Sequence, residues 1–190
     1  MTPMTDTELW RQFKDGHQSA YAAIYKGHAE YLLRYCYRIT SDELIIEDAI
    51  HDLFVEMWKN RSTIGHTDNI RAYLTVAIRR KIIKTIQKKQ KTESDKTPED
   101  LNFQTELAID EVIIATERSK EWASKLQSAM NQLSDRQREV LYMKYYSQMN
   151  NEEISEALGI NNQSVRNLTH RSIEQLKKLF FWIVLILFIA

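Results

Sequence analysis

The sequence predicts an all-α protein in which an acidic linker joins two small helical domains. Only 4 Gly and 2 Pro occur among its 190 residues, whereas β-rich folds need frequent turn residues. Apolar residues recur at helical spacing through most of the chain. A polar stretch that contains Pro98, residues 91–100, separates two helical blocks and is typical of a linker.

The first block, residues 7–90, predicts four helices. They are expected near residues 7–14, 19–40, 44–59 and 70–89. Asp15-Gly16 and the loop 61–69 supply breaks between them. We therefore assign residues 1–91 to the first domain.

The second block follows the linker, and residues 106–132 predict one or two helices. Ser134 with Gln137 three residues later is a capping-box signature that starts the next helix. The elements expected after it are a helix over residues 152–158, a turn at 159–160 and a helix that opens at 161 or 162. Two short helices around one glycine suggest a helix-turn-helix.

Composition sets the remaining boundaries. Residues 92–121 contain nine acids and three bases and are assigned to an acidic linker with partial helix. Residues 122–179 form the second domain, and residues 180–190 form an apolar tail.

Charge and cysteine content narrow the class of protein. Formal net charge is +0, from 26 basic and 26 acidic residues, which argues against a nonspecific nucleic-acid binder. The single cysteine, Cys36, excludes an internal disulfide framework and fits a reducing cytoplasm. The N-terminus lacks a signal-peptide pattern, so we expect a cytoplasmic protein.

The charge is strongly segregated, and residues 42–56 are its acidic part. They contain six acids and no Lys or Arg. Asp48, Asp52 and Glu56 repeat every four residues, which destabilises an isolated helix by a few tenths of a kcal/mol per pair. This face is either simply solvated or docks on a basic partner. Phe54 and Trp58 favour docking, because aromatic residues are enriched at interfaces.

Residues 70–91 are the basic counterpart, with eight Lys or Arg and no acid. An inward stripe at steps of four consists of Leu74, Ile78, Ile82 and Ile86. At about 100° per residue, Tyr73, Arg80 and Lys84 fall together on the outward side. Cations beside an aromatic ring suit phosphates and an unstacked base. A merely solvated basic helix is the alternative.

The second helix of the helix-turn-helix carries residue types that read DNA. Its inward positions are Val165 and Leu168. Its outward positions are Asn162, Gln163, Arg166, Asn167, His170 and Arg171. Asn and Gln pair with adenine, and Arg pairs with guanine or phosphate. We therefore expect this helix to bind DNA.

The whole pattern resembles the extracytoplasmic-function (ECF) class of the bacterial sigma-70 family, RNA polymerase sigma factors, over about residues 9–179. Four strings carry the resemblance in the family's order: IEDAIHDLFVEMWKNR, IRAYLTVAIRRKII, LSDRQREVLYMKYYSQMNNEEISEALGI and QSVRNLTHRSIEQLKKL. The resemblance implies region 2 for residues 1–91 and region 4 for residues 122–179. The wording INNQSVRNL is similar to sigma factors of Bacteroidetes.

The resemblance also implies roles by position. The helix that docks on the coiled coil of the polymerase beta-prime subunit is matched by Asp48, Asp52, Phe54 and Trp58. The segment that melts and reads the minus-ten element is matched by Arg71, Tyr73, Arg79, Arg80, Lys81 and Lys84. The loop 61–69 matches the one that captures a flipped base. The helix that reads the minus-thirty-five element is matched by Asn162, Gln163, Ser164, Arg166, Asn167, His170 and Arg171.

Five positions depart from the family. Family members often have Trp, Asn and Asp at the positions of Tyr73, Arg80 and Lys84. The segment that matches the minus-ten reader is therefore more basic than is usual in the family. The order of Leu168 and Thr169 is also inverted, which allows a slightly rotated recognition helix.

The implied function is transcription initiation. Implied partners are core RNA polymerase, including its beta subunit, promoter DNA and an anti-sigma factor that is soluble or membrane-bound. No catalytic residue, cofactor or metal is expected: Asp48 and His51 match half of a di-iron motif that has no second copy. The alternative is a dimeric helix-turn-helix regulator that acts without polymerase, which leaves the paired acidic and basic helices unexplained.

The apolar tail, residues 180–190, is too short to span a membrane. Eleven residues give about 16 Å of helix, and a bilayer core is about 30 Å thick. Two alternatives stay open: the tail packs on protein, or it dips into one leaflet while Lys177 and Lys178 stay at the surface. The second alternative adds peripheral membrane association to a cytoplasmic protein.

Overall fold

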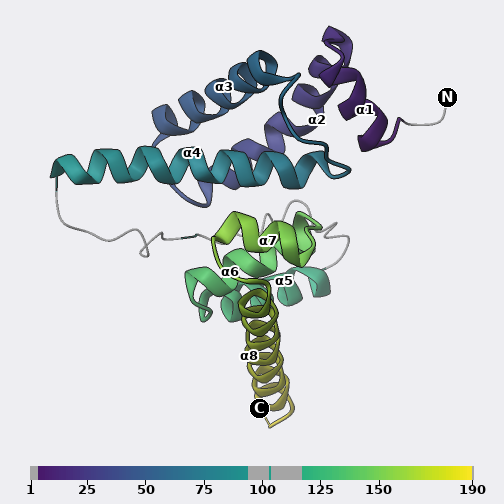
Figure 1. Cartoon of the computed structure of the whole chain (residues 1–190). Helices are drawn as coiled ribbons and strands as arrows, with labels where there is room; N and C mark the ends of the chain where they lie inside the picture. Colours follow the sequence, from purple (N-terminus) through teal and green to yellow (C-terminus); the bar gives the residue numbers. More distant parts are fainter. Residues whose placement is uncertain (1–3, 94–102, 104–116, 190) are drawn as a thin grey trace. The chain divides into compact units, whose positions relative to one another are not determined.

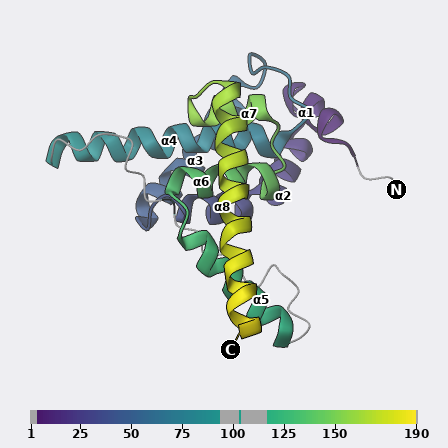
Figure 2. The same cartoon turned by 90° about the horizontal axis from the view of Figure 1, so that it is seen from below.

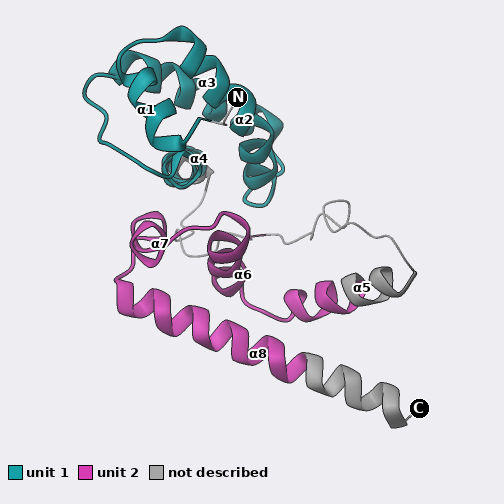
Figure 3. Cartoon of the chain, turned by 90° about the vertical axis from the view of Figure 1, so that its right-hand side faces the viewer, with its two compact units in different colours: residues 1–101 teal, residues 102–190 magenta. Residues whose placement is uncertain are grey.

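The computed structural model describes residues 4–93, 103 and 117–189, and side chains over 4–89, 103 and 124–179. All the regular structure in these residues is helical, as Figure 1 shows. The chain divides into two compact units, residues 1–101 and 102–190, coloured separately in Figure 3. The predicted all-α fold is confirmed.

The first unit contains four helices close to the predicted ranges. They are α1 (Asp6–Lys14), α2 (Gln18–Tyr37), α3 (Glu43–Asn60) and α4 (Ile70–Glu93). The long α4 packs against both α2 and α3 (Figure 1). Its predicted inward stripe is confirmed: Leu74, Ile78 and Ile82 are fully buried, and Ile86 is half-buried.

Side-chain caps mark the start of α1, α3 and α4, whereas α2, which follows His17, begins without one. Thr5 and Glu8 form a capping box at α1. Asp42 accepts a hydrogen bond from the Ile45 amide at 3.2 Å and caps α3. Asn69 accepts from the Ala72 amide at 3.0 Å, at the start of α4.

The second unit contains α5 (Glu117–Asn131), α6 (Asp135–Leu141), a π-helix (Tyr142–Tyr146), α7 (Asn151–Leu158) and α8 (Asn162–Ile189). The predicted capping box at Ser134 is confirmed: the Ser134 amide donates to Gln137 Oε1 at 2.9 Å, and Ser134 Oγ accepts in return. A second box, Asn150 with Glu153, starts α7. The π-helix was not predicted.

The turn between α7 and α8 is very short. Gly159 ends α7 with φ 64° and ψ 33°, in the left-handed region. The Ile160 amide donates to the Ser155 carbonyl at 3.2 Å, and Ser155 Oγ donates to the Ile160 carbonyl. Ser155 thus stabilises the turn through two hydrogen bonds with the Ile160 backbone. The predicted helix-turn-helix is present.

Most of the predicted linker lies outside the described residues, but Phe103 does not. Its side chain is 2% exposed. The ring lies edge-on to Tyr142, with centroids 5.9 Å apart. The Arg138 Nε donates to the Phe103 carbonyl at 2.9 Å. Phe103 therefore belongs to the core of the second unit, far in sequence from the helices it contacts.

Helix α8 continues into the apolar tail. Figure 2 shows α8 as one uninterrupted helix of 28 residues, Asn162–Ile189. The side chains of residues 180–189 lie outside those described. None of the helices within the described part of the chain is long and apolar enough to cross a membrane.

Candidate nucleic-acid and partner interfaces

The acidic face of α3 has an open centre. Asp48 and Asp52 are exposed and lie one turn apart. Neither has a hydrogen bond or ion pair within the residues that the structure describes. Two neighbouring carboxylates without a cation form a local negative field that favours a basic partner.

The two ends of the same face are neutralised by α4. The Lys81 Nζ lies 2.5 Å from Glu56 Oε1, and the Lys89 Nζ lies 2.8 Å from Asp42 Oδ2. The hydrogen bond from Lys89, with that from the Ile45 amide, holds the pKa of Asp42 below its usual range. Within the described residues, Asp48 and Asp52 therefore remain without an ion pair, as do the exposed Glu43 and Glu47 of the same helix.

The aromatic residues predicted for docking lie mainly inside the unit. Phe54 is 2% exposed, and its ring is 4.8 Å from that of Tyr25. Trp58 is half-buried, with Tyr21 at 5.0 Å and the Arg61 guanidinium 4.5 Å above its ring. The rings of Phe54 and Trp58 therefore pack α3 against α2 and do not form part of its exposed acidic face.

An apolar residue on the acidic face was missed by sequence reasoning. Leu44 is 72% exposed and lies one turn before Asp48. Leu44 precedes Asp48 by four residues, and residues four apart share a helix face. This spacing could have predicted that Leu44 lies on the acidic face. The face thus combines an exposed leucine with two unpaired carboxylates.

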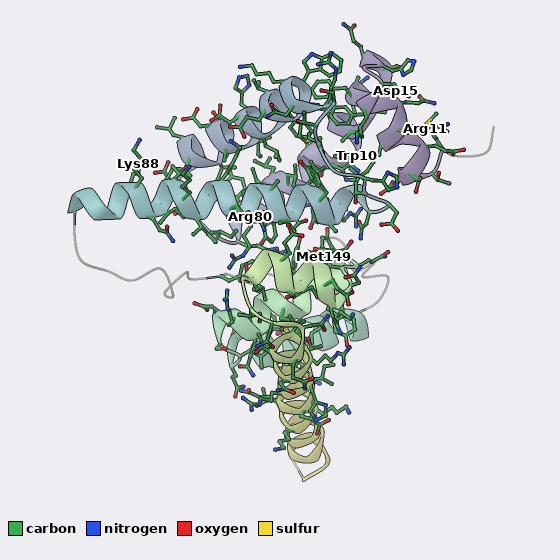
Figure 4. The ribbon with its side chains drawn as sticks, viewed as in Figure 1. Trp10, Arg11, Asp15, Arg80, Lys88 and Met149 are labelled. Atoms are coloured by element: carbon green, nitrogen blue, oxygen red, sulfur yellow. The ribbon has the colours of Figure 1, made fainter. Side chains whose placement is uncertain are left out.

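The predicted minus-ten residues differ in exposure. Arg80, labelled in Figure 4, and Lys84 are exposed on α4. Arg79, by contrast, is only 6% exposed. The half-buried members are Arg71, Tyr73 and Lys81. The structure therefore brings Arg80 and Lys84 together on an accessible face and places Arg79 in the interior.

Each half-buried member has a defined contact. The Arg71 guanidinium lies 4.9 Å above the ring of Tyr31. Tyr73 packs against Trp10, with ring centroids 4.8 Å apart. Lys81 is engaged by Glu56, as described above. The ring of Tyr73 therefore joins α4 to α1, which the sequence pattern did not suggest.

The first turns of α8 present the predicted polar face. Val165 is fully buried and Leu168 is half-buried. The exposed residues are Gln163, Arg166, Asn167, His170 and Arg171. Asn162 and Ser164 are half-buried, and Asn162 Nδ2 donates to Glu152 at 3.0 Å.

Two hydrogen bonds order the polar face of α8. The Asn161 side chain accepts from the Ser164 amide at 2.8 Å and so caps α8. Gln163 Nε2 donates to Asn167 Oδ1 at 3.0 Å, so these two amides are oriented together. Arg166 has no partner among the described residues, which leaves its guanidinium available to a base edge or phosphate.

Nothing in the described residues forms a metal site or a reactive thiol. No group of three His, Cys, Asp or Glu side chains within them could hold a metal ion. Asp48 and His51 are both exposed. Burial raises the pKa of the Cys36 thiol to about 12, so that thiol stays protonated at neutral pH.

Comparisons with known proteins match both units. The family model described as sigma-70 region 2 matches residues 24–92, and the model described as sigma-70, region 4 matches residues 123–176. The ECF RNA polymerase sigma factor SigL of Mycobacterium tuberculosis is 28% identical over 167 residues, 82% of this chain and 85% of SigL. The ECF sigma factor SigW of Bacillus subtilis is 27% identical over 176 residues, 88% and 92% of the two chains.

Two solved structures share the fold. One is CnrH in complex with the cytosolic domain of CnrY, with TM-score 0.56 and 19% identity over 92% of this chain and 96% of that one. The other is the sigma factor RpoE in complex with the anti-sigma factor NepR from Bartonella quintana, with TM-score 0.53 and 17% identity over 88% and 97%. The similarity to Bacteroidetes sigma factors stays a prediction.

Proposed function

The chain belongs to the sigma-70 family, in its ECF class, and we propose that it binds core RNA polymerase through α3 and recognises promoters through α4 and α8. The observation that carries the proposal is the exposed polar face of α8, because Gln163, Arg166 and Asn167 match the base edges of duplex DNA chemically. Residues 1–91 act as region 2 and residues 122–179 as region 4, with residues 92–121 as the linker between them.

Polymerase docking is assigned to the centre of the acidic face. Asp48 and Asp52 attract the basic coiled coil of beta-prime, and Leu44 supplies apolar contact beside them. Phe54 and Trp58 hold α3 against α2 and keep this face in position. Complementary charge mainly raises the association rate and fixes orientation.

Promoter melting is assigned to α4 and the loop before it. Arg80 and Lys84 contact phosphates of the separated strand, since both are exposed and four residues apart. Arg71, Tyr73, Arg79 and Lys81 support this face from half-buried or buried positions. The loop 61–69 receives the unpaired base.

The upstream element is read by α8. Gln163, Arg166 and Asn167 contact base edges, while His170 and Arg171 reach the flanking phosphates. Asn162 and Ser164 shape the start of the helix. No catalytic step is assigned to the chain.

Regulation is assigned to an anti-sigma factor. The RpoE structure contains the anti-sigma factor NepR, and the CnrH structure contains the cytosolic domain of CnrY. We propose that a comparable protein, soluble or membrane-bound, holds this chain inactive in the cytoplasm. In the membrane-bound case, residues 180–190 assist by packing on that protein.

The test is direct. Purified chain is mixed with core RNA polymerase, and the complex is analysed by size-exclusion chromatography and then by in vitro transcription. A one-to-one complex that initiates at specific promoters supports the proposal. A chain that ignores core polymerase and binds operator DNA as a dimer supports the regulator alternative instead.

A further inference from the structure

The loop 61–69 is held by the N-terminal segment through two hydrogen bonds. Trp10 Nε1 donates to the Gly65 carbonyl at 2.9 Å, in the middle of the loop. Asp6 Oδ2 accepts from the Ile70 amide at 2.9 Å, where the loop enters α4. These partners are distant in sequence, so tertiary structure alone brings them together.

The side chain of Trp10 is enclosed in the core of the first unit. It is 0% exposed and lies between Phe13 and Tyr73, with ring centroids at 5.1 and 4.8 Å. Figure 4 shows Trp10 on the inner side of α1, whereas Arg11 and Asp15 point outward. A buried indole N–H needs an acceptor, and the Gly65 carbonyl supplies it. The buried ring therefore fixes the position of the loop backbone.

The side chains that the loop leaves exposed are polar. They are Ser62, Thr63, His66 and Asp68. Thr67 instead turns inward: its hydroxyl accepts from the Asn69 amide and donates to the Asn69 carbonyl, both at 3.1 Å. A fixed backbone with outward donors and acceptors is preorganised for recognition, because little conformational freedom is lost on binding.

We propose that Trp10 and Asp6 are positioning residues for base selection: they touch no DNA, and they hold the loop so that its exposed side chains meet one unpaired base. The Trp10–Tyr73 contact extends this support to α4. It therefore fixes the loop relative to Arg80 and Lys84, the residues proposed to contact the separated strand. The inference rests on the proposed function, which gives the loop its unpaired base.

The test uses the full chain assembled with core polymerase. The probe is a pool of single-stranded DNA oligonucleotides, randomised over six positions, from which each holoenzyme selects its preferred bases. Trp10→Phe keeps an aromatic side chain of smaller volume and removes the N–H donor. We expect the selected preference to flatten at one position by about fivefold, the worth of one hydrogen bond, with the other positions unchanged.

Matched variants separate positioning from general damage. Tyr21→Phe removes a similar bond, from the Tyr21 hydroxyl to the Phe54 carbonyl at 3.1 Å, which ends on α3 and not on the loop, and should leave every preference unchanged. Asp6→Ala should flatten the same position as Trp10→Phe, and Asp6→Asn, which keeps an acceptor, should restore it. Asp6→Ala also serves if Trp10→Phe fails to fold.

The outcomes distinguish this inference from the proposed function. If the wild-type chain forms no complex with core polymerase, the proposed function fails. If holoenzymes form and both Trp10→Phe and Asp6→Ala select the wild-type bases at every position, the positioning role is overturned while the function stands.

Discussion

Replacing Phe103 by alanine should destabilise the second unit and leave the first unchanged. The ring is 2% exposed and edge-on to Tyr142 at 5.9 Å. Burying a phenylalanine side chain contributes about 1.5–3 kcal/mol, and the cavity left behind adds to its loss. The hydrogen bond from Arg138 goes to the backbone carbonyl, so Ala retains that acceptor. We therefore expect a loss of about 2–4 kcal/mol in the free energy of unfolding of the second unit.

Hydrogen exchange measured by mass spectrometry locates the effect. The two units are separate, so a single unfolding midpoint would mix them. Amides of α6 and the π-helix should exchange faster in Phe103→Ala, and amides of α2 and α4 should not. Phe103→Leu, which keeps most of the apolar volume, should lose less. Unchanged exchange in α6 would refute the reasoning, because the ring would then contribute nothing to this core.

Three further predictions concern charge. Changing Asp48 and Asp52 to Lys should abolish binding to immobilised core polymerase while the circular dichroism stays helical; unchanged affinity would reject the docking assignment. Arg166→Ala should cost about 1–3 kcal/mol in promoter binding if it contacts a base, measured by competition between matched and altered upstream elements; equal loss on both would indicate a phosphate contact. The pKa of Asp42 lies below its usual range, so its pair with Lys89 stabilises the unit at neutral pH. That contribution should fade below about pH 4 in urea titrations, and Asp42→Asn should remove the fading.

Periodicity and capping were readable from the sequence because both are local. The spacing of Leu74, Ile78 and Ile82 predicted the buried side of α4, and all three are fully buried. Ser134 and Gln137 predicted the start of α6, since a capping box needs only residues three apart. The same pattern at Asn150 and Glu153 would have fixed the start of α7 had it been used.

Burial of individual site residues was less predictable. Phe54 was expected at an interface, yet an aromatic residue suits a core equally well, and here the core contains it. Arg79 lies four residues after the fully buried Thr75 and three before the fully buried Ile82, so it shares their helix face and lies in the interior despite its charge. The spacing of residues along the sequence predicts the side of a helix on which a side chain lies. It does not predict which other helix packs over that side chain and buries it.

Long-range contacts left almost no trace in the sequence. The bond from Trp10 to Gly65 joins residues 55 positions apart, and neither position has an unusual local pattern. Phe103 is an isolated aromatic within a polar, acidic stretch, and that isolation was the one available hint. Within the π-helix Tyr142–Tyr146, the rings of Tyr142 and Tyr146 lie 4.7 Å apart, and the apolar spacing of the sequence predicted neither the π-helix nor this contact.

At Gly159, between α7 and α8, the left-handed backbone and not the available space decides which residue is tolerated. A Cβ added to Gly159 would meet nothing within 4 Å, yet the backbone there is left-handed. An l-alanine would therefore fit sterically and still cost about 1–2 kcal/mol in backbone strain. A d-alanine, introduced by chemical ligation, would adopt the same geometry without strain and restrict the unfolded chain, which stabilises by about 0.4–1 kcal/mol. The angle between α7 and α8 thus depends on the handedness of a single carbon atom, and a mirror-image residue would hold that angle more firmly than glycine does.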